Sequence, residues 1–200
     1  MVDLSPMLRE HGSLEACCPG QFGAPTPEAG VTFVAQKNLT LIDLRGNPRN
    51  PAFLASAHAA LGLALPLQPN TLASTADCSA LWLGPDEWLL VSRRHDHISE
   101  RLAIADGWLT DVSHGRSAWR ISGPHTLDVL AKGISVDLHM RAFAPGACMQ
   151  TGYAHVGVIV HRLDATTFDV YCARSYAQYL WHALTHAACE YGYEVLAAAE

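Results

Sequence analysis

After residue 30 the chain passes twice through the same predicted order of strands and helices, and this duplication constrains the fold more than any other feature. In the first pass residues 38–45 are expected to form a strand. Asn50 and Pro51 then begin a helix, because asparagine caps helices well and proline suits their first turn. In the second pass residues 117–122 form the strand, and the helix that follows it ends at Gly133.

Each half also contains two adjacent apolar runs around a short turn, which is the pattern of a β-hairpin. The predicted strand pairs are residues 79–83 with 87–92 and residues 156–163 with 168–173. A helix over residues 98–105 and a strand over 108–113 complete the first half. The order β-α-β-β-α-β, present twice, predicts an α+β protein with antiparallel sheets, helices on one face, and a pseudo-twofold relation between halves at about 31–114 and 115–200.

The last helix has its own start and stop signals. Ser175 and Gln178 have the spacing of a capping box at its N-terminus, and Gly192 is expected to end it. Residues 193–196 then supply a closing strand. The predicted buried stripe of this helix consists of Tyr176, Leu180, Ala183, Leu184 and Ala187.

Residues 1–30 mix glycine, proline and alanine in a way that breaks both helix and strand periodicity, so we expect an extended N-terminal arm. The first 14 residues lack the basic and apolar regions of a signal peptide. The apolar runs of the chain are interrupted before the ~18 residues that span a bilayer. Six cysteines, none in a C-x-x-C pair, are expected to be reduced thiols. These features predict a cytoplasmic protein with no membrane partner.

The charge balance argues against one class of partner and favours another. A net charge of -6, without a cluster of lysine and arginine, argues against nucleic acid, because phosphate binding requires such clusters. Only 16% of the residues are charged, against roughly 25% in an average soluble domain. A charge-poor surface is typical of a protein that a partner covers, although an alanine-rich sequence with an ordinary surface has the same composition.

Two places in the sequence have side chains suited to chemistry, one to a metal site and the other to a reactive thiol. His182, His186 and Glu190 lie on one face of the last helix, at a spacing compatible with metal ligation. The alternative is that they form the polar face of an amphipathic helix. Cys148 lies in a turn-rich approach to a strand, where it is either a reactive thiol or a small buried residue.

A third group lies at the junction of the two halves and consists of Asp111, Ser113, His114 and Arg116. A carboxylate, an imidazole and a guanidinium could converge there on a ligand, but a polar hairpin link without chemistry has the same composition. The sequence contains no Gly-x-Gly-x-x-Gly, Walker or Gly-x-Ser-x-Gly motif. We therefore assign no catalytic, cofactor-binding or metal-binding residue and predict a fold without a complete active site.

Four segments, in content and order, resemble the gamma subunit family of heterotetrameric sarcosine oxidase. They are residues 38–46 (NLTLIDLRG), 83–90 (LGPDEWLL), 117–124 (SAWRISGP), and 143–151 with Arg174 and Ser175. The segment LGPDEWLL is the most specific, and the match spans nearly everything after residue 35. The resemblance implies a fold like the folate-binding domain of the glycine-cleavage T-protein, which agrees with the duplicated pattern.

The resemblance also implies a role. Complexes of this family contain alpha, beta, gamma and delta subunits, oxidise sarcosine to glycine, reduce oxygen to hydrogen peroxide and pass the one-carbon unit to tetrahydrofolate. The other subunits carry FAD, FMN, NAD, zinc and the folate site, so this chain is expected to be a non-catalytic assembly subunit that contacts chiefly alpha. Trp82, Trp88 and Trp119 are candidates for that contact because tryptophans dominate interface energetics, although strand alternation places at least one in the core.

Two alternatives stay open. A free-standing folate-binding protein of the T-protein or iron–sulfur-assembly class would use Asp111 or Glu87 as a pterin contact. The iron–sulfur-assembly members carry Lys-Gly-Cys-Tyr-x-Gly, whereas this chain has Pro-Gly-Ala-Cys-Met-Gln around Cys148, so the lysine and the tyrosine are missing. The other alternative is the same subunit role in an oxidase of dimethylglycine or another N-methyl amine, because other subunits would select the substrate.

Overall fold

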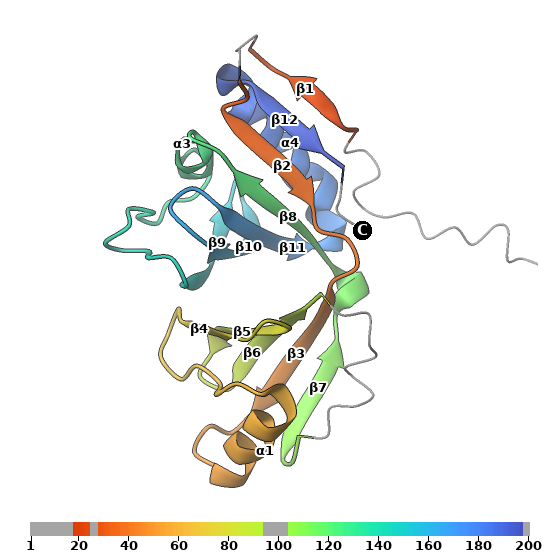
Figure 1. Cartoon of the computed structure of the whole chain (residues 1–200), viewed down its shortest axis with the longest axis vertical. Helices are drawn as coiled ribbons and strands as arrows, with labels where there is room; N and C mark the ends of the chain where they lie inside the picture. The colour runs from red at the N-terminus through yellow and green to blue at the C-terminus, as the bar shows by residue number, and fades with distance from the viewer. Residues whose placement is uncertain (1–17, 25–27, 94–103, 198–200) are drawn as a thin grey trace, which may run out of the picture.

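The computed structural model describes residues 18–24, 28–93 and 104–197 of the chain. It confirms an α+β fold, in which two sheets stack on each other and helices cover their outer faces (Figure 1). Apolar side chains fill three layers, one between each sheet and its helices and one between the two sheets. The protein therefore has four layers in the order helix, sheet, sheet, helix.

The first half of the chain builds a five-stranded sheet in the order β4-β5-β6-β3-β7. Its strands are β3 (Thr40–Gly46), β4 (Leu72–Ser74), β5 (Cys78–Gly84), β6 (Glu87–Ser92) and β7 (Gly107–Asp111). Strands β5 and β6 form the predicted hairpin. The predicted helix over 98–105 lies mostly outside the described residues. Strand β7 ends before the predicted residue 113, because a 3-10 turn (Ser113–Gly115) follows it.

Helix α1 (Pro51–Leu61) begins and ends at residues whose chemistry explains both boundaries. The Asn50 side chain accepts a hydrogen bond from the Ala52 N–H at 3.0 Å, which confirms the predicted cap. At the other end Gly62 has a φ of 69°, a left-handed conformation that glycine adopts without steric cost. Phe53 of this helix is fully buried in the layer against the five-stranded sheet.

The second half, together with the residues before β3, builds a seven-stranded sheet in the order β1-β12-β2-β8-β11-β10-β9. Its strands are β1 (Gly20–Phe22), β2 (Val31–Ala35), β8 (Arg116–Ser122), β9 (Cys148–Tyr153), β10 (Val156–Arg162), β11 (Phe168–Ala173) and β12 (Tyr193–Leu196). Helices α3 (Thr126–Ala131) and α4 (Ala177–Ala188) cover its outer face, and α4 lies behind β2 and β12 in Figure 1. The predicted hairpin β10–β11 and the predicted closing strand β12 are both confirmed.

The two sheets share one strand order, which confirms the internal repeat. The order β4-β5-β6-β3-β7 matches β9-β10-β11-β8-β12, except that β2 is inserted between β8 and β12. Strand β2 is antiparallel to β8 and parallel to β12. Strands β4 and β9 occupy equivalent places and extend the predicted order by one strand in each half. Strand β2 thus belongs to the sheet of the second half, and the division of the chain near residue 114 stays a prediction.

The start of the last helix differs from the prediction. Residues Arg174–Tyr176 form a 3-10 turn, and α4 begins at Ala177 without a side-chain cap. The predicted capping box of Ser175 and Gln178 is therefore wrong. Tyr176 is wrong as a core residue, because it precedes α4 and is 54% exposed. The correctly predicted members of the stripe are Leu180, Leu184 and Ala187, which are buried, and Ala183, which packs against them.

A buried arginine forms hydrogen bonds to the segment between α3 and β9. Arg162, at the end of β10, is 0% exposed, and its guanidinium donates to four backbone oxygens. The acceptors are Leu138 and Phe143 at 2.9 and 2.7 Å from Nη1, Asp164 at 2.9 Å from Nε, and Ala165 at 2.6 Å from Nη2. The Phe168 ring lies against the cation, with its centroid 5.0 Å from Cζ. One side chain thereby holds both the segment before β9 and the β10–β11 turn.

Candidate functional site: the layer between the two sheets

The two sheets face each other across a layer that is apolar at its centre and charged at one end. The apolar part contains Leu41, Leu81, Leu83, Leu89, Ala118, Cys148, Ile159 and Tyr171. At the charged end His161, Asp169 and Arg120 lie directly opposite one another across β10, β11 and β8. Since residues paired across strands share a face, all three project toward the five-stranded sheet.

Arg120 and Asp169 form a bidentate ion pair in this row. Nε and Nη2 of Arg120 donate to Oδ1 and Oδ2 of Asp169, both at 2.8 Å. Asp169 is 5% exposed and His161 is 7% exposed. Burial lowers the pKa of His161, so its imidazole is neutral at pH 7. The row therefore combines a compensated ion pair with a neutral imidazole.

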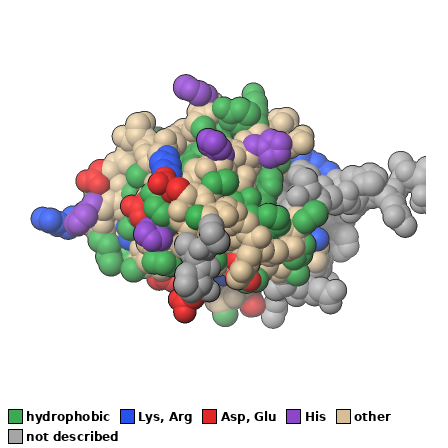
Figure 2. All heavy atoms as spheres, turned by 90° about the horizontal axis from the view of Figure 1, so that it is seen from above, with side chains coloured by type: hydrophobic (Ala, Val, Ile, Leu, Met, Phe, Trp, Pro, Cys, Tyr) green, Lys and Arg blue, Asp and Glu red, His purple; other side chains and the backbone are tan. Residues whose placement is uncertain are grey.

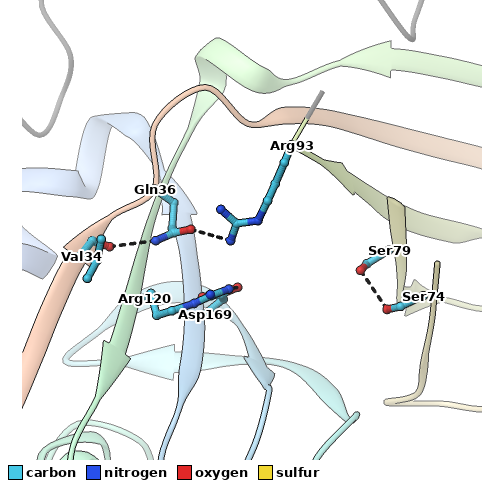
Figure 3. A network of polar contacts seen from close by, with 7 residues as sticks. All are labelled: Val34, Gln36, Ser74, Ser79, Arg93, Arg120 and Asp169. Carbon is cyan, nitrogen blue, oxygen red and sulfur yellow. Dashed lines mark hydrogen bonds and ion pairs between the residues drawn. The ribbon is translucent and has the colours of Figure 1, made fainter. Parts of the chain in front are cut away.

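A cleft of ≈ 130 Å³ separates this row from the five-stranded sheet, and Leu39, Val91 and Tyr171 are among its other walls. Figure 3 shows Arg93 reaching from β6 toward the seven-stranded sheet, where its Nη2 donates to Oε1 of Gln36 at 2.7 Å. Ser79 of β5 also lines the cleft, and its hydroxyl shares a hydrogen bond of 2.8 Å with that of Ser74 on β4 (Figure 3). The cleft is thus lined by side chains from both halves of the repeat.

Cys148 lies in the apolar part of the same layer. The residue is 0% exposed, and its thiol donates to the backbone oxygens of Thr71 at 3.3 Å and Trp82 at 3.6 Å. Burial raises the pKa of the thiol to about 11, so the nucleophilic thiolate is scarcely populated near pH 7. This geometry fits a small buried residue that joins β9 to the five-stranded sheet.

The structure does not bring His182, His186 and Glu190 together as a metal site. All three residues are exposed. The two histidines line an open groove on the outer face of α4, whereas the Glu190 carboxylate is paired with Nζ of Lys132. Within residues 18–24, 28–93 and 104–197, no group of three or more His, Cys, Asp or Glu side chains is arranged to hold a metal ion. Figure 2 looks onto the end that carries the seven-stranded sheet and shows histidines dispersed among apolar side chains.

The junction between the two halves is organised by hydrogen bonds within the turn and to β3. Oδ1 of Asp111 accepts from the Ser113 N–H at 2.9 Å, and the Ser113 hydroxyl accepts from the Leu41 N–H at 2.9 Å. The hydrogen bonds from Ser113 hold the pKa of Asp111 below its usual value. His114 is exposed and Arg116 begins β8. The polar residues of this junction therefore fix the path of the chain between the two sheets.

Asp111 and Glu87 do not converge on one ligand. Glu87 is paired with Arg45, with 2.9 Å between Oε2 and Nη2. Glu87 lies opposite Arg45 on β3, and Asp111 lies opposite Ile42. Because these two positions on β3 differ by an odd number of residues, the two carboxylates project from opposite faces of the sheet.

Two of the three tryptophans expected at a partner contact are core residues. Trp88 and Trp119 are 0% exposed, which confirms that at least one of the three lies in the core and removes both as candidates for a partner contact. Trp82 lies opposite Trp88, is half-buried and packs against the layer under α1. The exposed tryptophan of the described chain is Trp108 on β7, at 71%. In the sequence, the alternation of Trp108 with the apolar Leu109 along a strand could have indicated that one of the two side chains points to solvent.

Sequence reasoning did not identify the row of Arg120, His161 and Asp169. The available signal is a charged residue in the middle of an apolar strand, as Arg120 is in SAWRIS and Asp169 is in FDVYCA. That signal predicts an inward-facing charge, but only the pairing of β8 with β11 places the two residues together.

The fold and the sequence both match known proteins. Residues 45–190 match the model of the sarcosine oxidase, gamma subunit family. The sarcosine oxidase subunit gamma of Corynebacterium sp. (strain P-1) is 31% identical over 188 residues, which cover 92% of this chain and 90% of that protein. The same subunit from strain U-96 is 29% identical over 196 residues and covers 96% and 95%. No helix in the described part of the chain is long and apolar enough to span a bilayer.

Two solved structures extend the comparison. The heterotetrameric sarcosine oxidase from Corynebacterium sp. U-96, in complex with pyrrole 2-carboxylate, matches with a TM-score of 0.77 and 27% identity over 90% of this chain and 91% of that chain. The glycine cleavage system aminomethyltransferase T from Bartonella henselae matches with a TM-score of 0.63 and 12% identity, over 92% and 57%. This second likeness concerns the fold alone and agrees with the T-protein-like architecture expected from the sequence. The chain belongs to the gamma subunit family of sarcosine oxidase.

Proposed function

We propose that this chain is a non-catalytic subunit that stabilises a cytoplasmic heterotetrameric sarcosine oxidase and docks chiefly on the alpha subunit, beside beta and delta. The observation that carries the proposal is the match, over 90% of this chain, to a chain of a solved heterotetrameric complex. In the proposed reaction sarcosine, oxygen and tetrahydrofolate give glycine, hydrogen peroxide and 5,10-methylenetetrahydrofolate. FAD, FMN, NAD, zinc and tetrahydrofolate are held by the other subunits.

The contacts of the candidate residues support a structural role. The Cys148 thiol is buried and bonded to backbone oxygens of the facing sheet. The Asp111 carboxylate is bound within its own turn, and Glu87 is paired with Arg45. Each of these groups is engaged in a contact that stabilises the fold.

Large aromatic side chains on the surface support an assembly role. Trp108 is 71% exposed, and Tyr176 and Tyr179 are 54% and 52% exposed. Aromatic residues are enriched at protein interfaces and supply much of their binding energy. We infer that Trp108, on the edge strand β7, is the first residue to test as an anchor for a partner subunit.

Coexpression of the four subunits, with and without this chain, tests the proposal. With the chain present, we expect native mass spectrometry to detect a flavin-containing heterotetramer that forms hydrogen peroxide from sarcosine. Without it, we expect the remaining subunits to dissociate or to lose solubility. Stable, fully active complexes of the other three subunits would contradict the assembly role.

The non-catalytic part of the proposal is tested in assembled complexes. The variants Cys148→Ser, Asp111→Asn and Glu87→Gln are each expected to keep kcat and kcat/KM for sarcosine within about twofold of the wild type, because none contacts substrate. An intact tetramer that loses turnover through any one of them would show that this chain takes part in the reaction.

Two outcomes would replace the proposal by its alternatives. A chain that purifies alone and binds tetrahydrofolate is a free-standing folate-binding protein. A tetramer that oxidises dimethylglycine in preference to sarcosine keeps the subunit role but belongs to a related N-methyl amine oxidase.

A further inference from the structure

The charged row between the sheets is costly for stability. Removing ionic groups from water is unfavourable, and apolar residues of similar size often pack equally well in such places, as they do in the centre of this layer. The row nevertheless contains a full ion pair, and His161 and Tyr171 beside it are 7% and 2% exposed. A polar group retained at such a position needs a partner or a function.

Two of these largely buried residues, His161 and Tyr171, line the cleft. Buried polar side chains are almost always hydrogen-bonded to protein or to another molecule. Neither the imidazole of His161 nor the hydroxyl of Tyr171 is among the fully enclosed polar atoms that lack a partner, so both are available to water or to a ligand that enters the cleft.

The hydrogen-bonding inventory of the cleft determines what kind of ligand fits. Both carboxylate oxygens of Asp169 already accept from Arg120. Burial raises the pKa of Tyr171, so its hydroxyl keeps its proton and donates. The guanidinium of Arg93 donates, among the described residues, to the neutral amide oxygen of Gln36, and Figure 3 shows it above the Arg120–Asp169 pair. Donors are in excess, so the matching ligand is rich in acceptors.

Charge and size narrow the choice further. Asp77, which is exposed, and Asp169 both line the cleft and disfavour a ligand with two negative charges. The volume of ≈ 130 Å³ holds only a few heavy atoms, since a water molecule occupies about 30 Å³ and cofactor sites about 300–1,000 Å³. Leu39 and Val91 add apolar wall for a short hydrocarbon tail.

We propose that the cleft between the two sheets binds a small carboxylate monoanion, with its oxygens on Arg93, His161 and Tyr171 and its tail against Leu39 and Val91. The occupied site joins strands of both halves of the repeat. Binding at this site is separate from the assembly role, because it requires only residues of this chain.

Titration of the full-length chain with sodium acetate tests the site, with sodium chloride at equal ionic strength as the reference. We expect saturable amide shifts in β8, β10 and β11 by NMR, with a Kd on the order of 1–10 mM for so small a ligand. Tyr171→Phe keeps the ring and removes the donor, and Arg93→Gln removes an exposed cation. Each is expected to weaken acetate binding about tenfold or more. Arg45→Gln, which removes a guanidinium of the same sheet outside the cleft, is expected to leave the affinity unchanged.

Four results would overturn the proposal. The first is the absence of saturable amide shifts up to about 100 mM acetate. The second is an unchanged acetate affinity in both Tyr171→Phe and Arg93→Gln, and the third is an equal loss of acetate affinity in Arg45→Gln. The fourth is tighter binding of inorganic phosphate than of acetate. The titration needs no partner subunit, so its failure leaves the assembly role standing. Failure of the coexpression experiment likewise leaves the carboxylate site standing.

Discussion

Replacing Arg162 with methionine should expose how much one buried cation contributes to the second half of the fold. Its hydrogen bonds to Leu138 and Phe143 are fully buried, and a buried carbonyl left without a donor costs about 1–3 kcal/mol. The other two acceptors, Asp164 and Ala165, are exposed and can bond to water. Loss of the cation over the Phe168 ring adds about 0.5–2 kcal/mol. Relief of the cation's desolvation offsets part of this sum, so we expect a loss of about 3–5 kcal/mol.

Urea unfolding of the purified chain, followed by tryptophan fluorescence, measures this loss. Arg162→Lys keeps the charge but not the planar fork, so we expect an intermediate loss. Arg45→Met is the matched control, because that arginine is exposed and its pair with Glu87 contributes only about 0–1 kcal/mol. A loss below about 1 kcal/mol for Arg162→Met, or one no larger than for Arg45→Met, would refute the view that the two buried acceptors depend on Arg162.

Three further changes test other parts of the structure. A Cβ at Gly46 would collide with the Phe53 ring, so Gly46→Ala should lower the free energy of unfolding in urea by about 1–3 kcal/mol. The control is Gly157→Ala, whose Cβ meets no atom within 4 Å and which should change this free energy by less than about 0.5 kcal/mol. Burial lowers the pKa of His161 below its unfolded value, so the unfolded chain gains a proton first and stability should fall as the pH drops through about 6.5. That decline, measured by urea unfolding, should be smaller in His161→Gln, and equal slopes would mean that His161 titrates normally. Trp108→Asp should weaken assembly of the tetramer about tenfold or more in native mass spectrometry, whereas Trp108→Phe should assemble, and normal assembly of the aspartate variant would place the contact elsewhere.

Local signals in the sequence were sufficient for most of the individual elements. Asn50 and Pro51 mark the start of α1 through capping and proline chemistry, which act within a few residues, whereas Gly62 at the end of the helix was not recognised. The two hairpins follow from apolar runs around short turns, and their repetition predicted the duplicated architecture. The capping box at Ser175 failed because a 3-10 turn occupies the place where the spacing predicted the first helical turn.

The same local signals did not predict which strands pair when they are far apart in the sequence. Strand β2 has the same apolar alternation whether it pairs within the first half or the second, so its insertion between β8 and β12 is decided by tertiary packing. The row of Arg120, His161 and Asp169 depends on the register of the β10–β11 hairpin and on its pairing with β8, which lies much earlier in the sequence. An error of one residue in any register would move a side chain to the opposite face.

The insertion of β2 between β8 and β12 also sets an order of events during translation. A ribosome adds about 5–20 residues per second, N-terminus first, so β2 emerges well before either of its neighbours exists. The five-stranded sheet uses residues between Thr40 and Asp111 and can close early, whereas β2 gains its second neighbour only after β12 has been synthesised. Until then its apolar edge is open to other chains. Completion of the seven-stranded sheet therefore depends on the synthesis of β12, and a chain truncated before β12 would keep the five-stranded sheet but leave one edge of β2 unpaired.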